Sequence, residues 1–361
     1  MAKQMNQKTL IFSVLRLSFC IIIGLGAYSQ QPKIWSAAKA NEWYKKQPWL
    51  VGCDFLPSTA INQLEMWQAE TFDPVTIDRE LGWAHDIGMN VVRVYLHDLA
   101  WKIDPGGFKN RMHQFLNIAA KNRIKPMFVF FDDCWNPDPQ IGKQPEPKTG
   151  VHNSGWVRSP HVQVHNDSTK WDYLEPYVKD ILSHFKNDQR ILMWDLYNEP
   201  ANSDYGLSSM PLLKKSFEWA WSIRPSQPLS VGVWFDKFPE INAYQLDNSD
   251  VITFHNYDDT VSMKKAIDTL KKRGRPLICT EYMARTNNSR FETHLPILKR
   301  YNVGAINWGL VNGRSNTIFP WRSKEGSPEP PLWFHDVFHK DGRPYSEKEV
   351  NVIKKLTGAR K

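Results

Sequence analysis

Short apolar segments alternate with amphipathic segments from about residue 49 to the end of the chain. The apolar segments have the composition of buried strands, and the segments between them repeat apolar residues with a helical period. The predicted strands are Leu50–Phe55, Asn90–Leu96, Pro126–Phe131, Ile191–Tyr197, Leu229–Trp234, Val251–Phe254, Pro276–Thr280 and Gly304–Trp308. The predicted helices are Pro74–Ile87, Phe108–Asn122, Tyr173–Phe185, Leu212–Ile223, Met263–Lys272 and Arg290–Tyr301. Eight strand–helix repeats predict an α/β fold, a (β/α)8 TIM barrel.

Two predicted connections are long, and both follow the C-terminal end of a strand. Asp132 to Trp171 follows the third strand, and Leu310 to Trp333 follows the eighth. Barrel enzymes build their active sites at this face, so we expect the two loops to wall a substrate cleft, with ordinary surface insertions as the alternative. No low-complexity stretch or repeat interrupts the pattern, which predicts a single domain over residues 31–361.

The N-terminus has the composition of a signal peptide over residues 1–29. Lys3 and Lys8 precede the apolar run Leu10 to Leu25, and Ala27 and Ser29 supply small residues for cleavage. We therefore expect a secreted or periplasmic protein. Arg16 interrupts the apolar run, which argues against a retained membrane span. Lipid attachment at Cys20 is an alternative, although the preceding residue is a bulky Phe.

Composition excludes several classes of function. The 46 basic and 38 acidic residues give a net charge of +8, without a basic stripe suited to nucleic acid. Cys53, Cys134 and Cys279 are widely spaced, which predicts neither a disulfide framework nor a structural zinc. The histidines form no HxH or HExxH pattern, and no metal or other cofactor is expected. The chain has 16 Trp, most of which we expect in the hydrophobic core. Indole faces also stack on sugars, which gives the remaining Trp a possible use in binding carbohydrate.

Two of the predicted strands lead into a glutamate. The run from Trp194 ends in Asn198-Glu199-Pro200, and the run from Pro276 ends in Glu281. Hydrolysis of a glycosidic bond needs one carboxylic acid to protonate the leaving oxygen and a second carboxylate to attack or to activate water. The pair therefore predicts a glycoside hydrolase. The alternatives are a helix-start acid at Glu199 and a surface carboxylate at Glu281.

Alternation along a strand predicts which side chains share a face. Arg93 lies in an otherwise apolar strand, and its burial is costly unless a carboxylate at a neighbouring strand pairs it. The predicted shared faces are Val91, Arg93 and Tyr95 on the second strand, Val251, Thr253, His255 and Tyr257 on the sixth, and Leu277, Cys279 and Glu281 on the seventh.

These residues together resemble glycoside hydrolase family 5 and the wider clan A of retaining hydrolases. The resemblance covers nearly all of the chain after residue 31 and rests on Arg93, Asn198-Glu199-Pro200, His255-Asn256-Tyr257, Glu281 and Trp308. It implies that Glu199 is the general acid/base and Glu281 the nucleophile of a retaining mechanism.

The resemblance also implies supporting roles. Asn198 would bind the 2-hydroxyl of the reacting sugar, and Trp308 would floor its subsite. His255 and Tyr257 would orient the two carboxyl groups, and Arg93 would keep Glu281 ionised. Taken without the resemblance, His255 is also compatible with a core histidine and Arg93 with a structural ion pair.

The chain departs from the family pattern after the third strand. Many members have a histidine there, whereas this chain reads Phe131-Asp132-Asp133-Cys134-Trp135. We expect the acidic residues, Asp132 above all, to hydrogen-bond sugar hydroxyls and Trp135 to stack on a ring. The substrate, of cellulose, mannan or xylan type, stays open, as do internal versus terminal cleavage and the oligomeric state. A catalytically silent carbohydrate-binding barrel is the alternative function.

Overall fold

Eight parallel strands form the centre of the molecule in a computed structural model that describes residues 33–359. Their residues are buried almost throughout, as expected of a parallel sheet covered by helices. The strands are β1 (Val51–Asp54), β2 (Val91–Tyr95), β3 (Lys125–Asp132), β4 (Met193–Asn198), β5 (Leu229–Ser230), β6 (Ile252–His255), β7 (Leu277–Glu281) and β8 (Gly304–Trp308). Each predicted strand is present.

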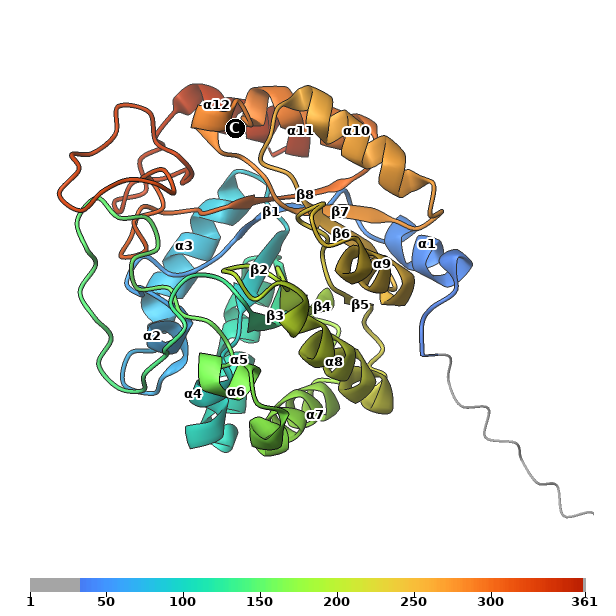
Figure 1. Cartoon of the computed structure of the whole chain (residues 1–361). Coiled ribbons are helices and arrows are strands. Elements are labelled where there is room, and N and C mark those ends of the chain that lie inside the picture. Colours follow the sequence, from blue (N-terminus) through green and yellow to red (C-terminus); the bar gives the residue numbers. More distant parts are fainter. Residues whose placement is uncertain (1–32, 360–361) are drawn as a thin grey trace, which may run out of the picture. The chain divides into compact units, whose positions relative to one another are not determined.

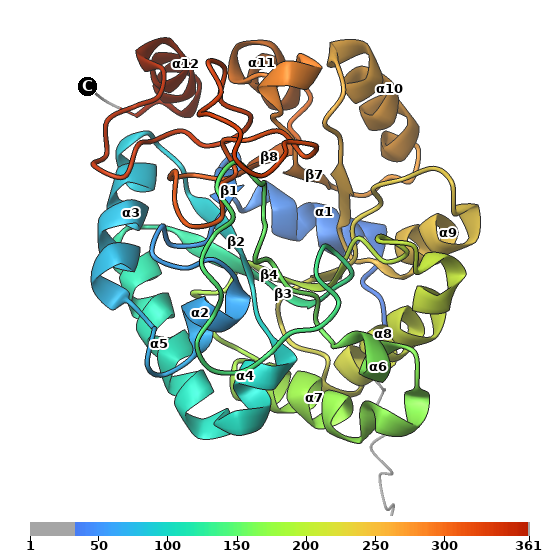
Figure 2. The same ribbon diagram turned by 60° about the vertical axis from the view of Figure 1, so that its left-hand side comes forward.

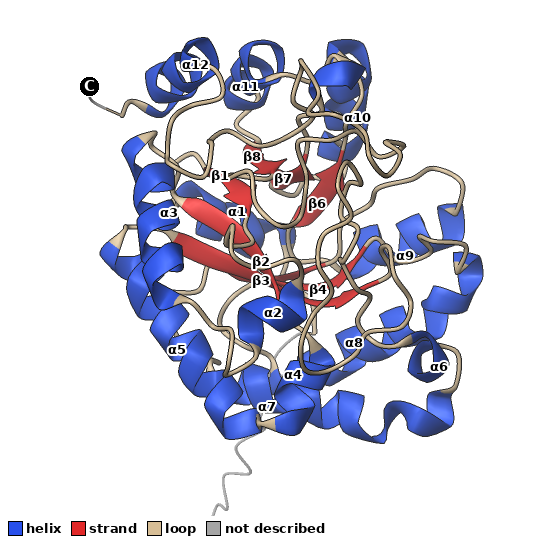
Figure 3. Ribbon diagram, turned by 90° about the vertical axis from the view of Figure 1, so that its left-hand side faces the viewer, coloured by secondary structure: helices blue, strands red, loops and turns tan. Residues whose placement is uncertain are grey.

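The strands follow one another around a nearly closed barrel. The hydrogen-bonded order is β5-β4-β3-β2-β1-β8-β7-β6, so β1 pairs with β8 as well as with β2. An isolated parallel bridge between Val233 and Phe254 joins the β5 and β6 sides. The predicted (β/α)8 barrel is confirmed, with the helices outside the strands (Figure 1; Figure 3).

The fifth strand is shorter than predicted and ends at Ser230 rather than Trp234. Side-chain donors there bind backbone carbonyls that would accept from backbone amides in a regular parallel sheet. The Ser230 hydroxyl donates to the carbonyl of Val251, and the Gln245 side-chain amide donates to the carbonyl of Gly232. Within residues 231–234, the pairing is thus reduced to the bridge of Val233 with Phe254.

The helices surround the strands, and several begin as the sequence predicted. Asp73 caps α3 by accepting from the amide of Thr76, and Pro74 occupies the first turn. The six predicted helices correspond to α3 (Pro74–Asp86), α5 (Pro105–Lys121), α7 (Leu174–His184), α8 (Met210–Ile223), α10 (Thr260–Lys271) and α11 (Phe291–Arg300). The prediction missed α1 (Ala37–Lys45), α2 (Gln63–Trp67), α4 (Asp98–Ile103), α6 (Val162–His165), α9 (Pro239–Asn248) and α12 (Glu347–Thr357).

Helix α1 covers the end of the barrel where the strands begin. Tyr44 packs there with residues that lead into or open the strands, among them Leu50, Val91 and Met193. The amide of Trp35 donates to Asp250, and the Tyr44 hydroxyl donates to the carbonyl of Asn302. One end of the barrel is therefore closed by apolar packing.

The two long loops lie at the other end of the barrel, where the strands finish. In Figure 1 they are the green and red segments on the left, and α1 is on the right. Figure 2 shows the green loop after β3 and the red loop after β8 side by side. Within residues 33–359 no helix has both the length and the apolar composition to cross a bilayer. The predicted signal peptide and Cys20 lie outside the described residues.

Candidate active site

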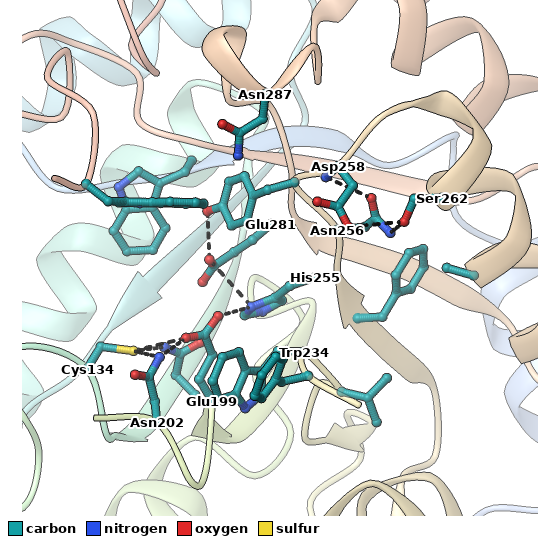
Figure 4. A pocket seen from close by; sticks show the side chains of 18 of the residues that line it. Cys134, Glu199, Asn202, Trp234, His255, Asn256, Asp258, Ser262, Glu281 and Asn287 are labelled. Atoms are coloured by element: carbon teal, nitrogen blue, oxygen red, sulfur yellow. Dashed lines mark hydrogen bonds and ion pairs between the residues drawn. The ribbon is translucent and has the colours of Figure 1, made fainter. Parts of the chain in front are cut away.

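A cavity of about 940 Å³ opens at the end of the barrel where the strands finish. Side chains that follow β4, β6, β7 and β8 line it, together with residues of the two long loops. Glu199, His255, Tyr257, Glu281 and Trp308 line the cavity, and so does Trp135. In Figure 4 the carboxyl groups of Glu199 and Glu281 point toward one another, and His255 lies beside both.

Glu199 is the first residue after β4 and has a left-handed backbone (φ 44°), which turns its side chain into the cavity. Its Oε2 accepts from the thiol of Cys134 at 3.2 Å and from the side-chain amide of Asn202. Burial raises the pKa of Glu199, against the opposing effect of these two donors. A raised pKa suits a carboxyl group that has to deliver a proton.

Glu281 ends β7, opposite Glu199. The nearest donors to its Oε1 are Nη1 of Arg93 at 2.9 Å and the hydroxyl of Tyr95 at 3.0 Å. Its Oε2 accepts from the hydroxyl of Tyr257 at 2.8 Å. Burial raises the pKa of Glu281, and the charge of Glu199 adds to that rise. The charges of His255 and Arg93 and the hydrogen bond from Tyr257 oppose it. The donors to Glu281 thus include a charged guanidinium, whereas the donors to Oε2 of Glu199 are both neutral.

His255 lies between the two carboxyl groups. Its Nδ1 is 2.7 Å from Oε1 of Glu199 and 3.5 Å from Oε2 of Glu281. Burial lowers the pKa of His255 to about 4, so the ring is neutral near pH 7. One atom each of Glu199, His255 and Glu281 lies within 4.8 Å of the others. That spacing fits a retaining pair of carboxyl groups, since an inverting pair stands about 6.5–9.5 Å apart.

Arg93 is fully buried beneath this pair and does not line the cavity. Besides Glu281, its guanidinium donates to Asp54, to Asp195 and, through Nη2, to Oδ1 of Asn198 at 2.7 Å. A single cation therefore faces three carboxyl groups, and burial raises the pKa of both aspartates. Arg93 is a structural ion-pair residue and a direct partner of Glu281 at once.

Asp132 is 2% exposed and does not line the cavity, which contradicts the expectation that it meets a sugar. Its oxygens accept from the indole of Trp156 at 2.7 Å, from the side-chain amide of Asn198 at 2.9 Å and from the amide of Cys134 at 3.0 Å. The carboxylate is thus fully engaged inside the protein. It fixes Asn198, whose side chain is held between Asp132 and Arg93.

Asp133 is equally buried and supports the segment after Glu199. It accepts from the hydroxyls of Tyr197 and Ser209, both at 2.6 Å, and from the amide of Ala201 at 3.0 Å. Glu199, Ala201, Ser203 and Asp204 all have positive φ, a run that non-glycine residues rarely adopt. The Asp133 bonds hold this run in place.

A family model comparison gives the decisive observation. The model described as Cellulase (glycosyl hydrolase family 5) matches residues 57–314, more than half of the chain. The chain belongs to glycosyl hydrolase family 5. It is therefore a glycoside hydrolase that acts with retention of configuration on a carbohydrate substrate.

Solved structures agree with the family 5 fold. A variant of GH5_18 from Streptomyces cattleya in complex with Manβ1-4GlcNAc has a TM-score of 0.60 at 11% identity, over 86% of this chain and 81% of that one. The endo-β-1,4-mannanase of Thermotoga petrophila has a TM-score of 0.55 at 15% identity, over 86% and 76%. The β-1,4-mannanase of the sea hare Aplysia kurodai has a TM-score of 0.52 at 15% identity, over 78% and 95%. No curated protein sequence matches.

Trp308 and Trp135, the two aromatic residues that the sequence analysis singled out for the site, both line the cavity of the family 5 enzyme. Trp308 is half-buried at the end of β8 and packs edge-on against Tyr95 and Trp156, with ring centroids 5.8 and 5.4 Å apart. Trp135 is 37% exposed at the rim of the cavity. Trp234 and Trp321 also line the cavity, so four indoles face a substrate there.

The sequence analysis did not identify four residues that contact the site residues. They are Asp54, Tyr95, Cys134 and Asp195. Tyr95 had a usable signal, because alternation placed it on the face of Arg93. Asp54 and Asp195 had a weaker one, since each is a lone acid in an apolar strand. Nothing in the sequence marked Cys134 as a partner of Glu199.

One trio at the strand ends has side chains close enough together that it could also hold a metal ion. Glu199, His255 and Glu281 come from three strands far apart in the sequence, and together they have the composition and spacing of a metal-ligand set. A spacing search along the chain cannot find such a set. Cys53, Cys134 and Cys279 are buried and, among the described residues, form no disulfide.

Proposed function

We propose that this family 5 enzyme hydrolyses β-linked glycans, with Glu281 as nucleophile and Glu199 as general acid/base. The observation that carries the assignment is the different environment of two facing carboxyl groups. Glu281 accepts from the charged Arg93 and from Tyr95 and Tyr257, whereas Oε2 of the buried Glu199 accepts only from the neutral side chains of Cys134 and Asn202. Two carboxyl groups whose surroundings separate their pKa values provide one acid and one nucleophile.

In the first step, an oxygen of Glu281 forms a bond to the anomeric carbon while the bond to the leaving oxygen breaks. The proton of Glu199 moves to that oxygen, so the aglycone leaves as a neutral alcohol. The product is a glycosyl ester of Glu281. Asn198, fixed by Arg93 and Asp132, is the candidate partner of the 2-hydroxyl, where a hydrogen bond strengthens in the transition state.

In the second step, Glu199 is a carboxylate and takes a proton from water. The water oxygen attacks the anomeric carbon, and the ester bond breaks to restore the Glu281 carboxylate. Arg93, Tyr95 and Tyr257 stabilise that returning charge. His255 is neutral and holds Glu199 toward the reacting oxygen in both steps.

The test is Glu281→Gln with β-linked glycans of the cellulose, mannan and xylan types as substrates. We expect turnover to fall by about 10⁴-fold or more while oligosaccharide binding persists, since the amide keeps the size of the side chain. Near-normal activity in the variant would refute the assignment of Glu281. The same assay with the unmodified enzyme separates hydrolysis from the silent carbohydrate-binding alternative, because a pure binder releases no reducing ends.

We also infer that the enzyme is exported, with residues 1–29 as a signal peptide and residues 31–361 as the catalytic domain. The support is the basic start, the apolar run and the small residues near Ser29. N-terminal sequencing of protein from the culture medium or periplasm tests this: a start near residue 30 supports export by cleavage. Fatty acylation at Cys20 would instead support the lipid-anchored alternative.

A further inference from the structure

The loops after β1, β3 and β8 are joined into one wall over part of the barrel mouth. Between the β3 and β8 loops, the amide of Asn153 donates to the carbonyl of Ser315 at 2.8 Å, and the amide of Gly326 donates to the carbonyl of Thr149 at 2.8 Å. His152 Nδ1 lies 2.8 Å from the carbonyl of Phe319. In Figure 2 these green and red loops run side by side above β1.

The β1 loop is joined to the same wall. The side-chain amide of Asn62 donates to the carbonyl of Gly155 at 2.8 Å, and the amide of Arg314 donates to the carbonyl of Ser58 at 3.1 Å. A Cβ added to Gly313 would lie 2.5 Å from the Cα of Ser58, so the two backbones are in close contact. These contacts fix three loops of distant sequence position as one barrier.

Behind Trp308, toward β1 and β2, lies a cavity of only about 20 Å³, bounded by Tyr95, Trp156, Trp308 and Asn153. A volume of that size holds about one water molecule. The active-site cavity therefore ends at Trp308 and the wall.

The cavity extends the other way, over β5 and β6. Its lining there includes Trp234 and Phe235 after β5, and Asp258 and Lys265 after β6. Phe235 is 47% exposed, and its ring stacks on that of Trp234 with centroids 5.1 Å apart. The pair of half-buried Trp234 and exposed Phe235 beside Glu199 offers a platform for a further sugar ring.

We propose that the enzyme removes single sugar units from the non-reducing end of a β-linked chain, an inference that rests on the proposed function. Trp308 and Asn198 place the reacting sugar on the walled side of the two carboxyl groups. The wall leaves no space for a sugar beyond it on the non-reducing side. The rest of the chain leaves past Glu199, over Trp234 and Phe235.

The walled end also carries hydrogen-bond acceptors for a terminal sugar. His335 is fully buried and lines the cavity; its Nδ1 is held by the carbonyl of Met283 at 2.6 Å, so Nε2 is an acceptor. Neither Nε2 of His335 nor Oδ1 of Asn153 has a hydrogen-bond partner among the described residues. Buried acceptors without partners are costly, and hydroxyls of the terminal sugar can satisfy them.

The closing experiment uses β-linked tetra- to hexasaccharides of glucose, mannose and xylose with a fluorescent label at the reducing end. Terminal cleavage shortens the labelled product by one unit at a time and releases only monosaccharide. Labelled fragments of several lengths at early times would overturn terminal cleavage and leave the hydrolase assignment intact. Absence of any hydrolysis across the panel would count against the proposed function and this inference together.

Two tryptophan variants separate the two ends of the cavity. Trp234→Ala should raise KM about tenfold for a labelled tetrasaccharide and by a clearly smaller factor for a nitrophenyl monoglycoside. Trp321→Ala is the matched variant at the walled end, where its ring lies 6.2 Å from that of His335. It should weaken both substrates alike. Equal losses on both substrates for Trp234→Ala would overturn the assignment of β5 and β6 to the rest of the chain.

Discussion

The thiol of Cys134 lies 3.2 Å from Oε2 of Glu199, so a weak donor touches the proposed acid/base. A hydrogen bond to the ionised carboxylate lowers its pKa, in opposition to burial. Cys134→Ala should therefore raise the pKa of Glu199 and move the alkaline limb of the kcat/KM pH profile to higher pH. Cys134→Ser supplies a stronger donor and should move the limb the other way. If the alkaline limbs of both variants coincide with that of the unmodified enzyme, the thiol does not influence Glu199.

Glu199→Ala should affect substrates according to their leaving groups. An oligosaccharide has to receive a proton as the bond breaks, and we expect a loss of about 10³-fold or more in kcat/KM for it. A dinitrophenyl glycoside leaves as a stable anion and should lose far less in the first step. Steady-state and burst kinetics on both substrates measure the difference. Equal losses on the two substrates would contradict the acid role.

Arg93 should control both stability and the acid limb of the pH profile. Arg93→Met leaves three buried carboxyl groups without their cation, and we expect a loss of about 3–5 kcal/mol in the free energy of unfolding. Because Arg93 lowers the pKa of Glu281, any remaining activity should show an acid limb shifted to higher pH.

Arg93→Lys is the control, since it keeps the charge but loses the paired bonds to Asp195 and the bond to Asn198. It should shift the acid limb less than the methionine variant does. Urea unfolding and pH–rate profiles test the pair. A methionine variant as stable as the unmodified enzyme would refute the structural role.

Stability should depend on pH through Asp133, whose pKa burial raises to about 7. A group with a raised folded-state pKa contributes stability that is complete below its unfolded pKa near 4 and is lost as the pH rises through 7. Asp133→Asn has one accepting oxygen in place of two and cannot accept from Tyr197, Ala201 and Ser209 together as Asp133 does, so it should be less stable than the unmodified enzyme at pH 5. The Tm difference should narrow by pH 8. A difference that is constant from pH 5 to pH 8 would contradict the raised pKa.

The fold could be predicted well from the sequence because apolar strand segments and helix-start residues are present along the repeats. The run of apolar strands, Asp73 before Pro74, and the carboxyl groups after β4 and β7 all have local signals. The missed helices are mostly short or follow a loop, as α2 and α6 do, and α9 follows the strand that was predicted too long. Local sequence patterns predict the structure less well where tertiary contacts, such as the hydrogen bond from Gln245 to Gly232, determine the backbone conformation.

One predicted face was wrong although its key residue was right. Leu277 and Cys279 pack in the layer between strands and helices, whereas Glu281 faces the barrel mouth. The register shifts here, because Phe254 pairs with Cys279 and His255 pairs with Glu281. Strict alternation would have pointed Glu281 away from the substrate. A register shift depends on the neighbouring strand and has no reliable signal in the strand itself.

Helix α1 has a consequence for how the enzyme can be displayed. It seals the barrel at the end opposite the cavity, and the described chain begins beside it at Lys33. If the enzyme is attached through a point just before Lys33 to a resin, a cell surface or a fused module, that partner lies next to the end of the barrel that α1 closes. The sugar-receiving end would then face outward, so attachment at this position should cost the enzyme little access to large, insoluble material.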